Sequence, residues 1–261
     1  MYAFDIERPG TVADAVTALK TEDAQALGGG QTLIPTLKQR LASPSKLVSL
    51  TGIDQIRGIC RSDAGEVCIG GATTHAEVAA GAGDYPALAA LAANIGDPAV
   101  RNRGTIGGSL ANNDPSACYP AAVLASGATV KTDRREIAAD DFFAGLFETG
   151  LEEGEIITEV RFPVPQKAAY IKFEQPASRF ALVGVFVAQF ADEVRVAVTG
   201  ASEGGVFRWT EAEEALSGNF APGALEGLTV PADDMIADMH GSAAYRAHLV
   251  GVLTRRAVAA T

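Results

Sequence analysis

Two short segments of this chain are rich in glycine and could bind an anion: residues 28–32 (GGGQT) and residues 104–109 (GTIGGS). Glycine has no Cβ atom, so its backbone can turn several N–H groups toward one point, and a phosphate can approach such a nest closely. An ordered glycine-rich loop also costs chain entropy, which favours a function for it. Tight turns are the ordinary alternative, and spacing alone supports both interpretations equally.

The standard motifs of nucleotide binding and hydrolysis are missing from the sequence. Gly28 and Gly30 are followed by Leu33 where a Rossmann fingerprint has its third glycine, and no Gly-x-x-x-x-Gly-Lys-Ser/Thr occurs. The serine-hydrolase elbow Gly-x-Ser-x-Gly and the zinc motif His-Glu-x-x-His are absent as well. If phosphates bind, they bind in another architecture, and we predict no catalytic residue.

The spacing of cysteines and histidines gives no support for a metal site. The three cysteines match neither an iron–sulfur nor a zinc pattern, and the three histidines have no suitable partners nearby. We therefore predict no metal site in this chain. His75 lies in the first turn of a predicted helix, where we expect its ring to face solvent or to be hydrogen-bonded.

Composition excludes several classes of protein. The chain has 261 residues, of which 48% are hydrophobic, so a disordered chain is excluded. Its net charge of −11 argues against a nucleic-acid partner, which would need clustered Lys and Arg. No apolar run is long enough for a membrane span, and residues 1–7 (MYAFDIE) do not resemble a secretion signal. An odd number of scattered cysteines suits a reduced compartment, so we predict a cytoplasmic protein without a membrane span.

Periodicity and capping signals predict the elements that position the two loops. A strand at residues 24–27 runs into the first loop, and Pro35 suits the first turn of the helix that follows it. Thr74 and Glu77 form a capping box for a short helix. Residues 97–114 show no clear period. Further helices are predicted at residues 11–19, 86–93, 119–125, 210–216 and 242–260, and further strands at residues 48–50, 56–60, 66–69 and 156–162.

A change of composition at the Pro-Val-Pro segment 163–165 divides the chain into two parts. Residues 1–163 form the first domain, with subdomains of roughly 1–53 and 54–163, and residues 164–261 form the second. Beyond the Pro-Val-Pro segment, three apolar runs predict an antiparallel meander: residues 170–173, 182–190 and 194–199.

Polar side chains near the second loop could contact a ligand. Residues 112–114 (NND) could hydrogen-bond a ribose or ribityl chain, although an Asn-Asp-Pro turn explains them nearly as well. Arg101 and Arg103 flank the loop and could face a diphosphate, but solvated surface arginines are more frequent. Trp209 is predicted to be a packing residue.

Several blocks that follow one another in this order resemble the FAD-binding medium subunit of the molybdenum hydroxylases, and above all the carbon monoxide dehydrogenase medium subunits and their relatives that act on N-heterocycles. The similarity covers essentially the whole chain, and blocks in register are much more specific than one glycine loop. The blocks are residues 27–38 (LGGGQTLIPTLK), 69–78 (IGGATTHAEV), 100–110 (VRNRGTIGGSL), 112–120 (NNDPSACYP), 154–158 (GEIIT), 170–180 (YIKFEQPASRF) and 241–246 (GSAAYR).

The resemblance implies an α+β protein with a vanillyl-alcohol-oxidase-type (PCMH-type) FAD-binding fold. This fold has two α+β subdomains and is followed by a small C-terminal α/β domain with an antiparallel sheet. In the family, the first glycine loop and the Thr-Ile-Gly-Gly loop hold the FAD diphosphate. The residues predicted in this way to bind the cofactor are Gly28, Gly29, Gly30, Gln31, Thr32, Leu33, Thr105, Ile106, Gly107, Gly108, Ser109, Asn112, Asp114, Ile157 and Lys172.

Within that set, the resemblance implies separate roles. Asn112 and Asp114 would lie along the sugar or ribityl part of FAD. Ile157 and Lys172 would lie near the flavin ring, with Lys172 stabilising negative charge on the reduced flavin. The family usually has an aspartate that contacts the cofactor at the position of Cys118. A thiol is a poor hydrogen-bond acceptor beside a carboxylate, so we expect this contact to be lost or replaced through the backbone.

The implied function is that of an FAD-carrying electron-transfer subunit of a heterotrimeric molybdenum hydroxylase. A small iron–sulfur subunit with two [2Fe-2S] clusters would supply the electrons, a large molybdopterin subunit would oxidise the substrate, and an external acceptor would receive the electrons. We expect a dimer of such heterotrimers. Three cysteines are too few for two four-cysteine clusters in this chain. The alternatives are an autonomous small flavin oxidase of the same fold and a non-catalytic assembly scaffold.

Overall fold

The N-terminal part of the chain builds a small parallel sheet with the strand order β1-β3-β2. The computed structural model describes residues 1–261. Thr11 starts the first helix as predicted, because its side chain accepts the backbone N–H of Asp14 at 3.1 Å. The elements are β1 (Asp5–Glu7), α1 (Val12–Ala18), β2 (Ala24–Leu27), α2 (Leu33–Lys38) and β3 (Lys46–Ser49).

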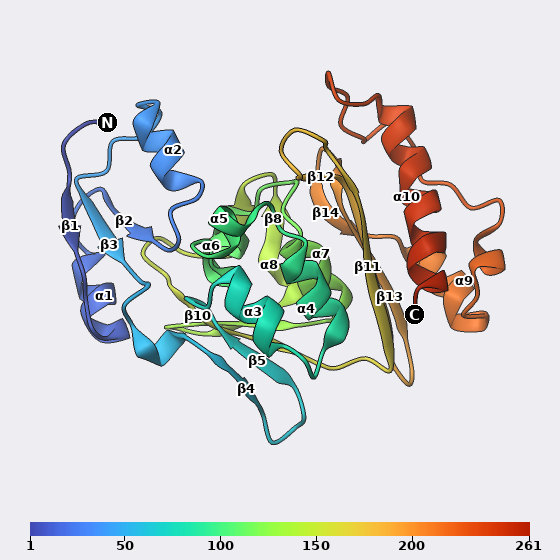
Figure 1. Cartoon of the computed structure of the whole chain (residues 1–261), viewed down its shortest axis with the longest axis horizontal. Coiled ribbons are helices and arrows are strands. Elements are labelled where there is room, and N and C mark those ends of the chain that lie inside the picture. The colour runs from blue at the N-terminus through green and yellow to red at the C-terminus, as the bar shows by residue number, and fades with distance from the viewer.

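The middle of the chain forms a five-stranded antiparallel sheet with the order β4-β5-β10-β6-β7. Short helices cover one face of this sheet, and their apolar residues join those of β5, β6 and β10 in the largest hydrophobic core (Figure 1). The strands are β4 (Ile59–Arg61), β5 (Val67–Gly70), β6 (Thr129–Thr132), β7 (Glu136–Ala138) and β10 (Ile157–Phe162). The helices are α3 (His75–Gly81), α4 (Pro86–Ala93), α5 (Pro98–Arg101), α6 (Ile106–Asn112), α7 (Tyr119–Ala125) and α8 (Ala139–Phe142).

Residues 97–114, which show no clear period in the sequence, contain helices α5 and α6. Asp97 caps α5, and Pro98 occupies its first position. Thr105 caps α6 by accepting the N–H of Gly108 at 3.1 Å. Capping thus starts a helix at a glycine-rich sequence that has no helical period. A small hairpin of β8 (Phe143–Gly145) and β9 (Glu148–Thr149) completes this part.

The C-terminal part is the predicted antiparallel meander, with the order β11-β12-β13-β14. Apolar residues on one face of this sheet join the middle core beside α4 and α7, and those on the other face pack against α9 and α10 (Figure 1). Trp209 is buried in that outer core, as predicted. None of the helices combines the length and the apolarity that a bilayer crossing needs. The elements are β11 (Lys167–Glu174), β12 (Ala181–Gln189), β13 (Val194–Ser202), β14 (Gly205–Arg208), α9 (Thr210–Gly218) and α10 (Ala243–Ala259).

Candidate functional site

A cavity of about 430 Å³ lies between the first and middle parts of the chain, and Arg179 and Phe180 of the C-terminal part also line it. Its wall is formed by the loop between β2 and α2, the turn before α3, the segment from α5 to α7, and the start of β10. Thirteen of the fifteen residues expected to bind the cofactor line it, and the exceptions are Ile106 and Lys172. Both glycine loops predicted from the sequence therefore meet at one cavity.

The first glycine loop presents unpaired backbone donors. The strand β2 ends at Leu27 and α2 begins at Leu33, and the backbone N–H groups of residues 28–33 donate no hydrogen bond within the chain. Gln31 and Thr32 are exposed, and the N–H groups at the start of α2 are free as at any helix start. Six consecutive free donors beside a cavity have the chemistry of an anion-binding nest, one of the two interpretations that the sequence left open.

The second glycine loop differs from the first in the pairing of its backbone N–H groups. All four N–H groups at the start of α6 are already paired, so this loop is not a second nest of free amides. The acceptors are the carbonyls of Gly71, Thr73 and Thr105 and the side chain of Thr105. The first N–H groups of a helix have no partner within the helix. Here two of them donate to carbonyls of the chain before α3.

Glycine is required in both loops because their backbones touch. A Cβ atom on Gly29 would overlap the carbonyl oxygen of Arg103, and one on Gly28 would lie 2.8 Å from Thr105 Oγ1. Gly107 lies against Gly71, where a Cβ atom would be 2.6 Å from the carbonyl oxygen. The close approach of the two loops at this cavity therefore depends on bare main chain.

Helix α6 ends in the polar segment 112–114, which forms one wall of the cavity. Asn113 adopts a left-handed conformation with φ of 41°, and its side-chain N–H₂ group donates to the carbonyls of Gly145 and Glu148 at 2.8 Å each. It thus fastens the β8–β9 hairpin to this wall. Asn112 and Asp114 line the cavity, and one Asp114 oxygen accepts the N–H of Ser116 at 2.8 Å.

Lys172 lies behind the cavity wall, with a side chain that is fully buried. Its ammonium donates to the carbonyls of Asn94 at 2.6 Å and Arg179 at 2.9 Å, and it lies 3.9 Å from Cys118 Sγ. Cys118 itself lines the cavity. Burial raises the pKa of this thiol, and the nearby Lys172 partly opposes that effect. The positive charge of Lys172 therefore approaches the cavity through the thiol of Cys118.

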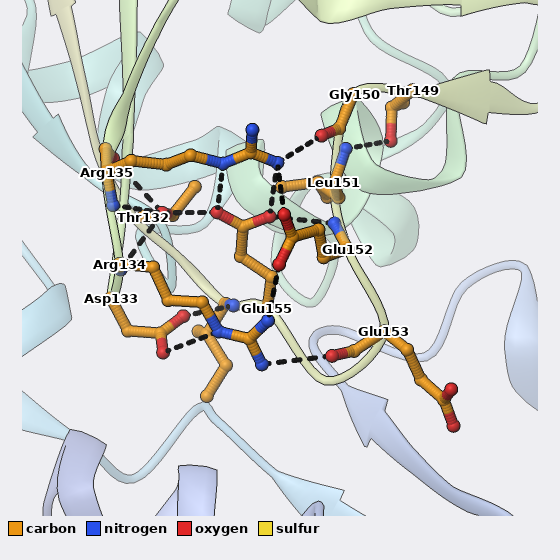
Figure 2. A network of polar contacts seen from close by, with 11 residues as sticks. Thr132, Asp133, Arg134, Arg135, Thr149, Gly150, Leu151, Glu152, Glu153 and Glu155 are labelled. Carbon is orange, nitrogen blue, oxygen red and sulfur yellow. Dashed lines mark hydrogen bonds and ion pairs between the residues drawn. The ribbon is translucent and has the colours of Figure 1, made fainter.

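A polar network around Glu155 holds the segment before β10 against the cavity (Figure 2). The buried Glu155 carboxylate accepts hydrogen bonds from Thr132 Oγ1 at 2.7 Å, from Arg135 Nε at 3.1 Å and from the Glu152 backbone N–H at 2.7 Å. Burial alone would raise the pKa of Glu155, but these hydrogen bonds and the charge of Arg135 lower it to about 2. The network fixes the chain just before Ile157, which lines the cavity.

The expectation for His75 is wrong. Its ring is 5% exposed, it lines the cavity, and its Nδ1 atom has no hydrogen-bond partner. The ring packs against that of Tyr119 at a tilt of 49° with 5.3 Å between the centroids, and it lies against Gly104. Burial, with a smaller effect of Arg101, lowers the pKa of His75 to about 4, so the ring is neutral at pH 7. The missing side chain of Gly104 makes this burial possible, and the helical cap alone gave no sign of it.

The two arginines beside the second loop do not line the cavity. Arg101 donates to the carbonyls of Ile95 and Gly96 at 3.1 and 3.0 Å, while Arg103 is exposed. The sequence analysis missed several lining residues, among them Gly71, Gly96, Ser116, Glu155 and Phe180. The glycine at position 71, next to Gly70, could have indicated a close backbone approach.

Comparison with known proteins gives concordant matches. A family model described as "FAD binding domain in molybdopterin dehydrogenase" matches residues 2–165. The nicotine 6-hydroxylase medium subunit of Paenarthrobacter nicotinovorans is 36% identical over 96% of this chain and 94% of its own length. The carbon monoxide dehydrogenase medium chain of Afipia carboxidovorans is 36% identical over 98% and 96%, respectively.

Solved structures agree with these matches. A chain of reconstituted CO dehydrogenase from Oligotropha carboxidovorans superposes with a TM-score of 0.88 and 33% identity, over 99% of this chain and 97% of that one. A chain of quinoline 2-oxidoreductase from Pseudomonas putida 86 gives a TM-score of 0.87 and 28% identity, over 99% and 96%.

Proposed function

The chain belongs to the family of FAD-binding medium subunits of the molybdenum hydroxylases, and we propose that its large cavity holds FAD with the diphosphate against residues 28–33. The observation that carries this proposal is the run of six backbone N–H groups without a partner in the chain. They offer the donors that two neighbouring phosphates need, without any basic side chain. The family resemblance and the geometry thus point to the same loop.

The remaining predicted contacts are part of the same proposal. Residues 105–109 pack against the first loop. They have no side chain at Gly107 and Gly108 to obstruct the ligand, and they offer it the Ser109 hydroxyl instead of free amides. Asn112 and Asp114 are placed to contact the sugar or ribityl chain. Ile157 would lie beside the flavin ring. The positive charge of Lys172 would act on that ring from behind Cys118.

The chain is the FAD-carrying electron-transfer subunit of a molybdenum hydroxylase complex, an oxidoreductase whose other cofactors lie on partner subunits. When bound, FAD supplies the ability to accept electrons singly and to release them in pairs. The work of this chain is to bind the coenzyme, orient it and set the polarity around its ring. We propose no acid, base or nucleophile.

The assembly is proposed by analogy with the relatives, which are medium subunits of multi-subunit dehydrogenases and hydroxylases. A small subunit with two [2Fe-2S] clusters would deliver electrons, and a large molybdopterin subunit would oxidise the substrate. We propose a dimer of heterotrimers in the cytoplasm that passes electrons to an external acceptor. Residues 1–163 would form the FAD-binding domain, with subdomains of about 1–53 and 54–163, and residues 164–261 would form the C-terminal domain.

The test is a ligand series on apoprotein from which flavin has been removed. Binding of FAD, ADP and riboflavin is measured by fluorescence quenching for the flavins and by competition for ADP. We expect FAD to bind most tightly, ADP to compete with it, and riboflavin to bind at least 100-fold more weakly than FAD. Riboflavin that binds as tightly as FAD would show that residues 28–33 do not bind the diphosphate. A chain that binds neither flavin would refute the function itself.

A further inference from the structure

Two thiols and a carboxylate gather on the middle sheet, away from the large cavity. They belong to Cys60 on β4, Cys68 on β5 and Glu159 on β10, and one ligand atom from each lies within 4.8 Å of the others. Cys60 is directly opposite Cys68, and Glu159 is opposite Gly70, two residues along β5 from Cys68. Because side chains alternate along a strand, all three lie on the same face of the sheet.

This cluster has space beside it. The three residues line a second cavity of about 280 Å³, and Gly58 and Gly70 line it as well. None of the three lines the large cavity. The space next to the thiols leaves room for a further ligand, such as a water molecule.

The strand register disfavours a direct disulfide between the two thiols. Hydrogen bonds join the pair Ser62–Glu66 at 3.0 Å and the pair Gly58–Gly70 at 2.9 Å. Hydrogen-bonded and non-hydrogen-bonded pairs alternate along an antiparallel ladder, so Cys60 and Cys68 form a hydrogen-bonded pair. Opposite Cβ atoms are about 4.5–5.5 Å apart and are closer in non-hydrogen-bonded pairs. A disulfide needs a separation of about 3.8 Å.

A tetrahedral metal ion suits this register better than an S–S bond. Zinc–sulfur bonds of about 2.3 Å place two thiolate sulfurs roughly 3.8 Å apart, a span that the Cβ atoms of a hydrogen-bonded pair allow without backbone movement. Glu159 uses its Oε1 atom to accept from Arg161 Nε at 2.8 Å, and no hydrogen bond occupies its other oxygen. That second oxygen is therefore free for a cation.

The charges on this face permit a cation. Lys131 is opposite Glu159 and Arg161 is opposite Cys68, so both cations lie on the same face as the three ligands. Arg161 is paired with both Glu136 and Glu159, so its charge is already offset. With both thiols ionised, the three ligands would carry three negative charges, more than Lys131 alone balances.

We propose that Cys60 Sγ, Cys68 Sγ and one Glu159 carboxylate oxygen form a site for a thiophilic divalent cation such as Zn²⁺, with water as the fourth ligand. Thiolate sulfur selects zinc over magnesium or calcium. Binding releases the two thiol protons to solvent and changes no oxidation state. Because the three ligands come from adjacent strands, the cation ties the edge strand β4 to β5 and β10. Its role is therefore to stabilise the pairing of these three strands.

The experiment uses the full-length chain with FAD bound and its thiols reduced. Equilibrium dialysis against Zn²⁺, followed by metal analysis, should show one bound ion per chain. Replacement by Co²⁺ should give the visible bands of a four-coordinate thiolate site, at longer wavelengths than oxidised flavin absorbs. Cys60→Ser and Cys68→Ser should each weaken Zn²⁺ binding more than the roughly 100-fold caused by loss of an outer-shell partner. Glu159→Gln should weaken it by about tenfold or more.

Matched controls separate this site from adventitious metal. Asp63→Asn alters an exposed carboxylate in the turn between β4 and β5 and should leave Zn²⁺ binding unchanged. Retained flavin and an unchanged circular dichroism spectrum show that each variant is folded; because Cys60 is exposed, its substitution tests the site even if Cys68→Ser unfolds the sheet. Failure of the reduced chain to bind Zn²⁺, binding that survives Cys60→Ser, or a Cys60–Cys68 disulfide under anaerobic purification would each overturn the proposal.

Discussion

Replacing Glu155 with glutamine should destabilise the protein in a pH-dependent way. The carboxylate has a pKa of about 2 in the folded chain, against an ordinary value of 4.5. A depressed acid stabilises the fold above its unfolded pKa, and this contribution disappears as the pH falls toward the folded pKa. The full shift sets a ceiling of about 3 kcal/mol at pH 7. Because the guanidinium of Arg135 is 43% exposed and screened by water, we expect Glu155→Gln to cost about 2 kcal/mol.

The pH dependence can be worked out separately from that total. At pH 3.5, one unit below the ordinary pKa, the unfolded chain has taken up the proton on Glu155 and the folded chain has not. Between pH 7 and pH 3.5 the free energy of unfolding of the wild-type protein should therefore fall by about 1.4 kcal/mol more than that of Glu155→Gln. Other acidic groups titrate in both proteins. The difference between their free energies of unfolding therefore reports on Glu155 alone.

The assay is urea unfolding of both proteins at several pH values, followed by circular dichroism. Glu153→Gln is the control, since Figure 2 shows that its carboxylate points away from the network and makes no contact there. A gap between wild type and Glu155→Gln that stays constant from pH 7 to pH 3.5 would contradict the reasoning. So would a control that destabilises as much as Glu155→Gln does.

Three further outcomes are expected. Gly29→Ala should weaken FAD binding at least tenfold, because its methyl group collides with the Arg103 backbone, whereas Gly83→Ala, which meets nothing within 4 Å, should bind FAD normally in a fluorescence titration. In native protein freed of metal by a chelator, a thiol reagent should modify the exposed Cys60 quickly and the two buried thiols only after unfolding, as timed by absorbance. Lys172→Met should lower the reduction potential of bound flavin in a dye-linked redox titration, because a cation behind the wall is lost, and an unchanged potential would refute that role.

The sequence predicted the longer elements well where one physical signal decided them. Helix α4 matches the predicted residues 86–93, because proline starts it and a run of apolar helix formers continues it. Strand β12 was visible as a continuous apolar run, and both of its faces are indeed buried. The short strands β1, β6 and β7 were missed, since three or four half-polar residues show no usable period.

The location of the candidate site was predictable from the sequence, but which of its two loops has free N–H groups was not. Glycine spacing located both loops, and only the fold shows which amides remain free. The N–H groups of residues 106–109 donate hydrogen bonds within the chain. Two of their acceptors, the carbonyls of Gly71 and Thr73, lie more than thirty positions earlier. Likewise Cys60, Cys68 and Glu159 meet through strand register, which no local spacing encodes. Side-chain chemistry can be recognised locally, whereas pairing depends on the tertiary structure.

The site is built from close backbone contacts, and Cys118 takes no part in them. Gly29 touches the backbone of Arg103, Gly107 touches Gly71, and Gly71 in turn lies against the Ile157 carbonyl. This series joins the first loop, the start of α6 and strand β10 without using any side chain. Backbone contacts therefore hold the amides at residues 28–33 in position, independently of the side chain at position 118. A change at Cys118 should alter the surroundings of the flavin ring and leave the diphosphate end intact.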